Sequence, residues 1–266
     1  MRTTSDKAEI HGFLRQDPVH GAYATGDLEP AYFAACTWYL AGTQGAAQAL
    51  ALIYRDLDPP VLLTLGSMDG VEAIFGQAPM PGRIYMSGQI EHLPSFLARY
   101  DFRADRVRPM LRMAVTAGSF RPFARPGAPG LVLRRLGVAD AAALSRLYGQ
   151  GGPHLPDAYD PAQLAGGIFT ALARESDGEL VAVAGTHLVA PHWGVAAVGN
   201  VYTHPGYRGR GYGRAVTGAV TAELLGRGLQ VVLNVERDNQ AALHLYTKLG
   251  YHVHGPYYEG IGVRKT

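Results

Sequence analysis

Residues 200–214 read NVYTHPGYRGRGYGR and join the end of an apolar strand pattern to the start of a helical one. Three alternate glycines, Gly209, Gly211 and Gly213, omit Cβ atoms where the backbone must curl closely around a ligand. The first amides of the following helix lack partners within it, and the helix dipole adds positive potential at that end. The stretch therefore predicts an anion site that fits a pyrophosphate.

The spacing of the glycines narrows the choice of phosphate ligand. A Walker loop requires G-x-x-x-x-G-K-[ST], which the sequence lacks, and a dinucleotide fingerprint requires G-x-G-x-x-G, whereas this loop reads G-x-G-x-G. Both observations count against ATP and NAD. Arg208, Arg210 and Arg214 add positive charge beside the predicted site. Taken alone, the loop is equally compatible with a flexible turn.

A second motif lies one helix and one strand downstream, where residues 239–251 read NQAALHLYTKLGY. With it, the chain resembles the GNAT acyltransferase superfamily over roughly residues 131–258. The family signature [R/Q]-x-x-G-x-[G/A] is matched by Arg208, Gly211 and Gly213. The second family signature, N-x-x-A-x-x-[LF]-Y-x-[KR]-x-G-[FY], is matched by Asn239, Ala242, Leu245, Tyr246, Lys248, Gly250 and Tyr251.

The resemblance implies acetyl-CoA as acyl donor and no metal. The backbone of the strand before the loop would pair with the pantetheine arm, at Val201, Tyr202 and Thr203. The loop would bind the pyrophosphate through Arg208, Gly209, Arg210, Gly211, Tyr212, Gly213 and Arg214. Asn239 would contact the cofactor, or cap its helix, or both. Tyr246 would touch the cofactor and protonate the departing thiolate, the alternative being a tyrosine that only packs in the core.

The general base is not identified by the resemblance. Many relatives carry a Glu on the strand before the last helix, but the matching residue here is Asn234, which takes no proton at neutral pH. Glu236, two residues on, is expected on the same side of the strand and is the candidate base. The other candidates are His187, His204 and Glu259, and a chain of waters could replace any of them.

Two domains are expected, with the division in the segment RPFARPGAPG at 121–130, where proline and glycine indicate a linker. We assign 1–125 to a degenerate GNAT-like domain and 126–266 to a GNAT N-acetyltransferase domain. The predicted fold class is α/β (α+β), with two tandem GNAT-like domains in which a mixed central sheet is flanked by helices. This layout also resembles tandem acyltransferases, including the glycine N-acyltransferase type.

Composition sets further bounds on the 266-residue chain. A net charge of +2 and the lack of a Lys/Arg cluster argue against a nucleic-acid partner. No apolar run suits a signal peptide or a membrane span, so a cytoplasmic protein without a membrane partner is expected. One cysteine, Cys36, excludes an intramolecular disulfide. A homodimer is left open.

The functional expectation is transfer of an acetyl group from acetyl-CoA to a primary amine of a small molecule or amino acid. The alternative from another class is a non-catalytic CoA-binding regulatory module, since the base is unassigned. A third possibility is an aminoacyl or other acyl donor in the same fold. Release of free CoA in the presence of amines separates the first two.

Overall fold

The computed structural model describes residues 1–123, 129–152, 155–156 and 159–265, which fall into two compact units. The N-terminal unit comprises 1–112 together with 254–266, and the C-terminal unit comprises 113–253. Each unit has its own core, with strands and helices of the predicted α/β class. Within the described residues no helix is both long enough and apolar enough to cross a membrane.

The N-terminal unit is built on an antiparallel meander that ends in one parallel step. Its strand order is β1-β2-β3-β4-β5-β12-β6, where β4 and β5 are parallel and the earlier neighbours antiparallel. The elements are β1 (Arg2–Thr4), α1 (Lys7–Leu14), α2 (Ala22–Gly26), α3 (Pro30–Phe33), β2 (Cys36–Thr43), β3 (Ala46–Tyr54), β4 (Val61–Gly66), α4 (Met68–Gln77), β5 (Arg83–Gln89), η1 (Ile90–His92), α5 (Leu93–Arg99) and β6 (Tyr100–Val115).

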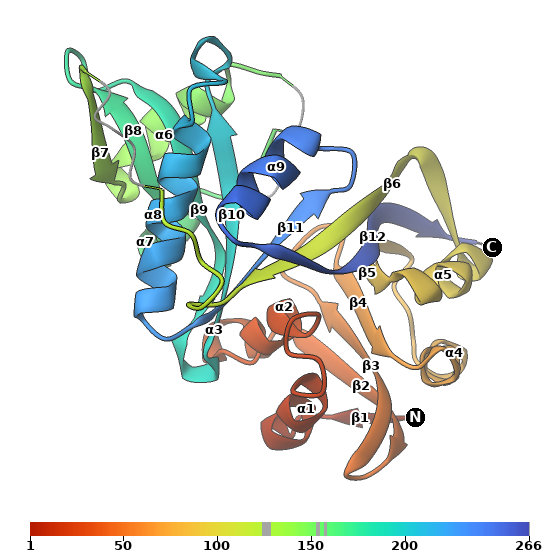
Figure 1. Ribbon diagram of the computed structural model, residues 1–266. Coiled ribbons are helices and arrows are strands. Elements are labelled where there is room, and N and C mark those ends of the chain that lie inside the picture. Colours follow the sequence, from red (N-terminus) through yellow and green to blue (C-terminus); the bar gives the residue numbers. More distant parts are fainter. Residues whose placement is uncertain (124–128, 153–154, 157–158, 266) are drawn as a thin grey trace. The chain divides into compact units, whose positions relative to one another are not determined.

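The C-terminal unit repeats this order of elements. Its strands run β11-β10-β9-β8-β7, with β10 parallel to β11 and antiparallel to β9. Figure 1 shows α8 lying along β9 and β10. The elements are β7 (Leu131–Arg135), η2 (Val138–Asp140), α6 (Ala141–Tyr148), α7 (Gln163–Gly166), β8 (Thr170–Arg174), β9 (Leu180–Ala190), η3 (Pro191–Trp193), β10 (Val195–Thr203), η4 (Pro205–Tyr207), α8 (Tyr212–Gly226), β11 (Gln230–Glu236) and α9 (Gln240–Lys248). The remaining strand, β12 (His252–Arg264), follows α9.

The last strand of the chain returns to the N-terminal unit. β12 pairs antiparallel with β5, from Tyr257↔Gln89 to Val263↔Arg83. The predicted boundary between residues 125 and 126 therefore does not coincide with the compact units, since residues 254–266 lie with the first of them. As a statement about independently folding domains the predicted division stays a prediction. The boundary itself falls on residues 124–128, outside the described part of the chain.

The connection between β4 and α4 shows how the first copy differs from the second. It consists of Ser67 alone, whose hydroxyl caps α4 by accepting a hydrogen bond from the Gly70 amide at 3.3 Å. The Ser67 hydroxyl thus takes up an amide at the N-terminus of α4, and such amides are the donors that a bound anion would need. In the C-terminal unit the corresponding connection, between β10 and α8, spans residues 204–211.

Candidate active site

The parallel strands β10 and β11 separate at the predicted pantetheine site. β10 and β11 are paired from Val195↔Gln230 to Val198↔Leu233, although β10 continues to Thr203 and β11 to Glu236. Beyond these pairs, the backbone groups on the facing edges have no partner strand in the β10–β11 ladder. An extended ligand can therefore pair with one of these edges as an added strand does.

A bulge in β10 marks the same point. The register with β9 shifts between Gly199 and Tyr202, and Asn200 adopts a left-handed backbone with φ of 54°. Its carbonyl oxygen accepts a hydrogen bond from the Tyr148 hydroxyl at 3.0 Å, and its Nδ2 donates to Gln163 Oε1 at 2.9 Å. Asparagine tolerates this conformation better than most residues do. The bulge thus turns β10 away from a regular ladder where the thioester is expected.

The loop after β10 leaves the first amides of α8 without a side-chain cap. Gly209 and Gly211 have φ of +75° and +77°, a region that favours glycine, and Gly211 is the N-cap of α8 without any side-chain cap bond. A Cβ on Gly213 would lie 3.0 Å from Leu245 Cδ1 and 3.2 Å from Thr203 Oγ1. Gly209 and Gly211 therefore serve the turn, whereas Gly213 lets α8 approach α9 and β10.

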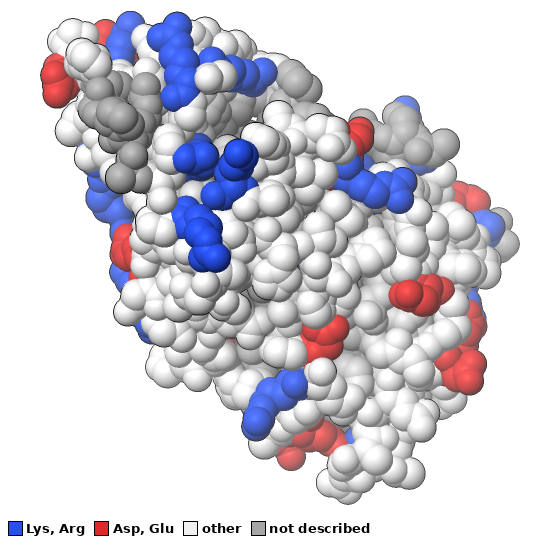
Figure 2. Space-filling view, viewed as in Figure 1, with Lys and Arg blue, Asp and Glu red and all other residues white. Residues whose placement is uncertain are grey.

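The three loop arginines have different surroundings. Arg208 donates from Nε to the Thr203 carbonyl at 3.1 Å, and Arg210 lies over the Tyr207 ring at 5.4 Å. Arg214 lies over the ring of Phe123, and its Nε is buried without a hydrogen-bond partner among the described residues. Figure 2 shows Lys and Arg side chains gathered over the part of the molecule where α8 begins in Figure 1. Positive charge thus accompanies the start of α8, whose N-cap residue makes no side-chain cap bond.

Tyr246 lies on α9 with 7% of its surface exposed, and its ring centroid is 5.9 Å from that of Tyr251. Burial raises the pKa of the Tyr246 phenol, so the hydroxyl is protonated and able to donate at neutral pH. Asn239 caps α9, its side-chain oxygen accepting a hydrogen bond from the Ala242 amide at 3.1 Å. The capping role of Asn239 is observed, while its contact with a cofactor stays a prediction.

The candidate bases fall in different places. Glu236 ends β11 and is half-buried, and Asn234 has a side-chain oxygen that is buried without a partner among the described residues. The His187 ring packs against Gly199, where a Cβ would lie 2.3 Å from Nε2, so His187 borders the bulge. His204 caps η4 through Nδ1, which accepts from the Gly206 amide at 3.1 Å. This capping explains the presence of His204 without catalysis.

Glu259 belongs to the other unit and is engaged there. Its two carboxylate oxygens accept hydrogen bonds from Tyr85 at 2.7 Å and from Tyr257 at 3.1 Å, and Arg108 lies 3.3 Å away. Burial raises the pKa of Glu259, although these partners oppose the rise. The carboxylate is therefore part of a hydrogen-bonded network in the N-terminal unit, and its candidacy as the base stays a prediction.

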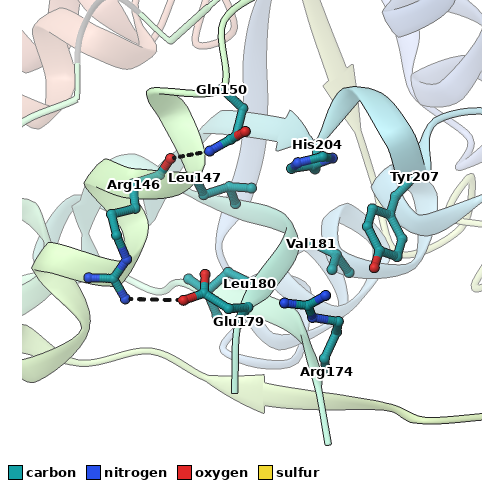
Figure 3. A pocket seen from close by; sticks show the side chains of 9 residues that line it. All are labelled: Arg146, Leu147, Gln150, Arg174, Glu179, Leu180, Val181, His204 and Tyr207. Carbon is teal, nitrogen blue, oxygen red and sulfur yellow. Dashed lines mark hydrogen bonds and ion pairs between the residues drawn. The ribbon is translucent and has the colours of Figure 1, made fainter. Parts of the chain in front are cut away.

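A separate hollow of about 270 Å³ opens beside the loop on the side of α6 (Figure 3). Its rim includes His204 and Tyr207 of the turn, together with Arg146 and Arg174. Arg146 is 3.6 Å from Glu179, and Arg174 pairs with Asp177 at 2.6 Å. Because acids already neutralise both arginines, the hollow lacks the free positive charge expected of a phosphate site.

Phe123, Tyr148 and Asn200 were missed by the sequence reasoning. Phe123 lies in the predicted linker, so its contact with Arg214 and its 3.4 Å approach to a Cβ on Gly211 depend on tertiary structure alone. Asn200 stands in a strand pattern, where only its low β-propensity could have signalled a bulge. Tyr148 ends α6, and its bond to Asn200 could not be inferred from the local sequence.

A sheet with a parted parallel pair, followed by a glycine- and arginine-rich loop at a helix start, defines an acyltransferase-like α/β fold. Residues 142–251 match the sequence model of the Acetyltransferase (GNAT) family. This matched region carries both motifs on which the resemblance to the GNAT superfamily rests.

Three known proteins place this domain among its relatives. A mycothiol acetyltransferase of Tsukamurella paurometabola is 40% identical over 104 residues, which cover 37% of this chain and 34% of that protein. The chain thus spans about a third of the length of the curated relatives that it matches. A Drosophila protein of known structure covers 98% of this chain and 97% of its own, with a TM-score of 0.76 at 13% identity.

The predicted tandem architecture is confirmed at the level of the fold. A tandem GNAT protein from the clavulanic acid biosynthesis pathway covers 99% of this chain and 98% of its own, with a TM-score of 0.57 at 13% identity. The order of strands and helices is repeated in the two units, with the parallel step after the fourth strand in both. The first unit is therefore GNAT-like in topology, and the second carries the family match.

Proposed function

We propose that the chain is an acetyl-CoA-dependent N-acetyltransferase that acts on the primary amine of a small molecule or amino acid. The observation that carries this proposal is the parting of β10 from β11 directly before the uncapped N-terminus of α8. The first feature suits an extended amide-bearing arm and the second suits its pyrophosphate. Relatives named mycothiol acetyltransferase support a small-molecule acceptor.

In the proposed reaction the acceptor nitrogen attacks the thioester carbonyl, a C–N bond forms, and the C–S bond breaks. The departing thiolate takes its proton from the Tyr246 hydroxyl, which burial keeps protonated. The attacking nitrogen loses a proton to Glu236, directly or through water. Backbone amides of residues 201–203 hold the pantetheine arm, and Asn239 contacts it from the start of α9.

We assign cofactor binding to the C-terminal unit alone, so one acetyl-CoA binds per chain. The N-terminal unit supports this assignment because the Ser67 hydroxyl caps α4, the helix between the parallel strands β4 and β5. No loop comparable to residues 204–211 separates β4 from α4. Full-length protein with Gly211→Asp should retain no acetyl-CoA site, and a residual stoichiometric site in calorimetry would place a second one elsewhere.

The test of the function is release of free CoA from acetyl-CoA, followed with a thiol reagent across a set of small-molecule amines. Amine-dependent release that saturates with one acceptor supports the proposal. Tight acetyl-CoA binding with no amine-dependent release from any acceptor would favour a CoA-binding regulatory module, the alternative suggested by Asn234 in place of a base. Glu236→Gln then tests the base: turnover should fall by about 10²-fold, with acetyl-CoA affinity unchanged.

A further inference from the structure

Three side chains that the proposed reaction does not use meet in the N-terminal unit. Asp17 and His20 follow α1, and His254 lies on β12. Asp17 Oδ2 is 2.9 Å from His20 Nδ1, and Asp17 Oδ1 is 2.9 Å from His254 Nε2. The two imidazole centroids are 4.7 Å apart and edge-on. One ligand atom from each residue lies within 4.8 Å of the other two.

The surrounding backbone holds this cluster in place. The His20 amide donates to Asp17 Oδ1 at 3.0 Å, which fixes the carboxylate at the turn. Gly255 follows His254, and a Cβ there would lie 2.7 Å from His20 Cε1 and 2.9 Å from Nε2. Glycine at position 255 therefore leaves room for the His20 ring to approach β12 this closely. The positions of both imidazoles depend on residues outside the three.

We propose that Asp17, His20 and His254 form a binding site for one divalent transition-metal ion, for which Zn²⁺ is the best match. Two imidazole nitrogens and one carboxylate oxygen are a ligand set that zinc favours, with the fourth position left to water. Zinc bonds of about 2.0 Å in tetrahedral geometry place ligand atoms about 3.3 Å apart. From the single oxygen Asp17 Oδ2 the separations are 2.9 Å to His20 Nδ1 and 3.1 Å to His254 Nε2, so the ion could replace the bridging hydrogens after a small outward movement.

Access and charge are both compatible with an ion. The side chains of Asp17 and His254 are 44% and 31% exposed, whereas that of His20 is 12% exposed. Arg112 opposes a cation, since its guanidinium is near enough to act on His20. That guanidinium is held over the rings of Tyr23 and Tyr257 and interacts with the buried carboxylate of Glu259, which offsets its charge.

Such an ion would stabilise the fold and would take no part in the acetyl transfer. It would join the turn after α1 to a strand 237 residues away in sequence. Because the ion would bind the folded chain and not the unfolded one, it would raise stability by mass action. The site is independent of the proposed function, because its residues belong to the N-terminal unit and the cofactor loop to the C-terminal unit.

The experiment titrates chelator-stripped full-length protein with Zn²⁺ in a calorimeter and with Co²⁺ by visible absorption. We expect one ion per chain and an intense Co²⁺ spectrum of four-coordinate type. Asp17→Asn and His254→Ala should each weaken Zn²⁺ binding by more than about 100-fold, since losing a mere supporting partner costs 10–100-fold. His252→Ala is the matched control: the same residue type on the same strand, two positions away, should bind as the wild type does.

Two results would overturn the proposal. The first is the absence of saturable Zn²⁺ binding by the stripped wild type. The second is binding that His254→Ala and Asp17→Asn leave intact. Circular dichroism and acetyl-CoA affinity report whether each variant is folded. Asp17→Asn keeps an acceptor oxygen for the His20 amide, so it tests ligation even if His254→Ala disturbs β12.

Discussion

The guanidinium carbon of Arg214, a residue in the first turn of α8, lies 3.4 Å from the ring centroid of Phe123. The same ring is 3.4 Å from the position that a Cβ on Gly211 would take. A residue from the segment between β6 and β7 therefore forms one wall of the predicted pyrophosphate loop. Its ring lies against the guanidinium of Arg214, which we predict to bind the cofactor.

Phe123→Ala should weaken acetyl-CoA binding by about two- to fivefold, because an exposed cation–π contact contributes about 0.5–1 kcal/mol. Phe123→Leu, which keeps an apolar side chain without the π face, should show most of the same loss. Calorimetry with acetyl-CoA measures both variants. Tighter binding by Phe123→Ala would mean instead that the ring obstructs the loop.

Substitutions of Gly211 separate backbone strain from charge. Gly211 has φ of +77°, which asparagine and aspartate tolerate comparably, and a Cβ there meets only the Phe123 ring at ordinary contact distance. Gly211→Asp should abolish measurable acetyl-CoA binding because it places a carboxylate beside the free amides. Gly211→Asn, nearly identical in shape but neutral, should retain much more affinity. Equal losses in the two variants would show that charge at this loop is irrelevant.

Tyr246→Phe removes one hydroxyl from a buried ring. Turnover should fall by about 10²-fold, since the variant lacks the donor to the thiolate, while the apparent KM for acetyl-CoA changes little. Tyr246→Ala serves as the packing control and should also lower the melting temperature, because Tyr246 is almost fully buried. Full activity in Tyr246→Phe would leave solvent as the proton donor.

Alkaline pH should destabilise the C-terminal unit through its buried tyrosines. Burial raises the pKa of Tyr148, Tyr246 and Tyr251, so each binds its proton more tightly when folded. Above about pH 10, where an unfolded tyrosine ionises, the folded state therefore holds more protons and the free energy of unfolding falls as pH rises. Below about pH 10 these tyrosines cause no pH dependence of the free energy of unfolding.

Urea unfolding on both sides of pH 10 measures this effect. Tyr251→Phe removes one of the three groups and should make the decline above pH 10 shallower. The slope against pH is compared, not the absolute stability, because the variant also loses the 2.7 Å hydrogen bond between Tyr251 and Thr221. An unchanged slope in Tyr251→Phe would contradict the prediction.

Truncation before His254 should damage the N-terminal unit. Residues 254–264 fill the place between β5 and β6 and bring Tyr257 and Glu259 to Tyr85 and Arg108. Their removal exposes the edge of β5, so amides in Arg83–Gln89 should exchange with solvent much faster. A chain lacking only residues 265 and 266, which lie beyond β12, should keep its protection. Undiminished protection of β5 in the longer truncation would contradict the pairing.

The C-terminal unit could be predicted from the sequence almost element by element, because its apolar periodicity and turn residues agree with its tertiary structure. Strand β10 and helix α8 lie where residues 200–214 join an apolar strand pattern to a helical one. The two motifs located the loop and Tyr246. The bulge at Asn200 and the approach of Phe123 could not be predicted, since both depend on contacts between segments distant in sequence.

The N-terminal unit was harder to predict, and β6 shows why. This strand of 16 residues was missed because it carries arginines, among them Arg108 and Arg112, where an apolar face was sought. Those arginines are accommodated by Glu259 and by the rings of Tyr23 and Tyr257, all of which come from other elements. A local hydrophobic pattern cannot report charges that are compensated across a sheet.

The position of β12 between β5 and β6 also determines when the sheet of the N-terminal unit can be completed during synthesis. The ribosome delivers β5 and β6 early, yet β12, the strand that lies between them, is translated after every other described strand. Until then the nascent N-terminal unit carries an open sheet edge of the kind that pairs with other chains. Its final structure is therefore acquired only after β12 has left the ribosome, when the C-terminal unit can already be folded.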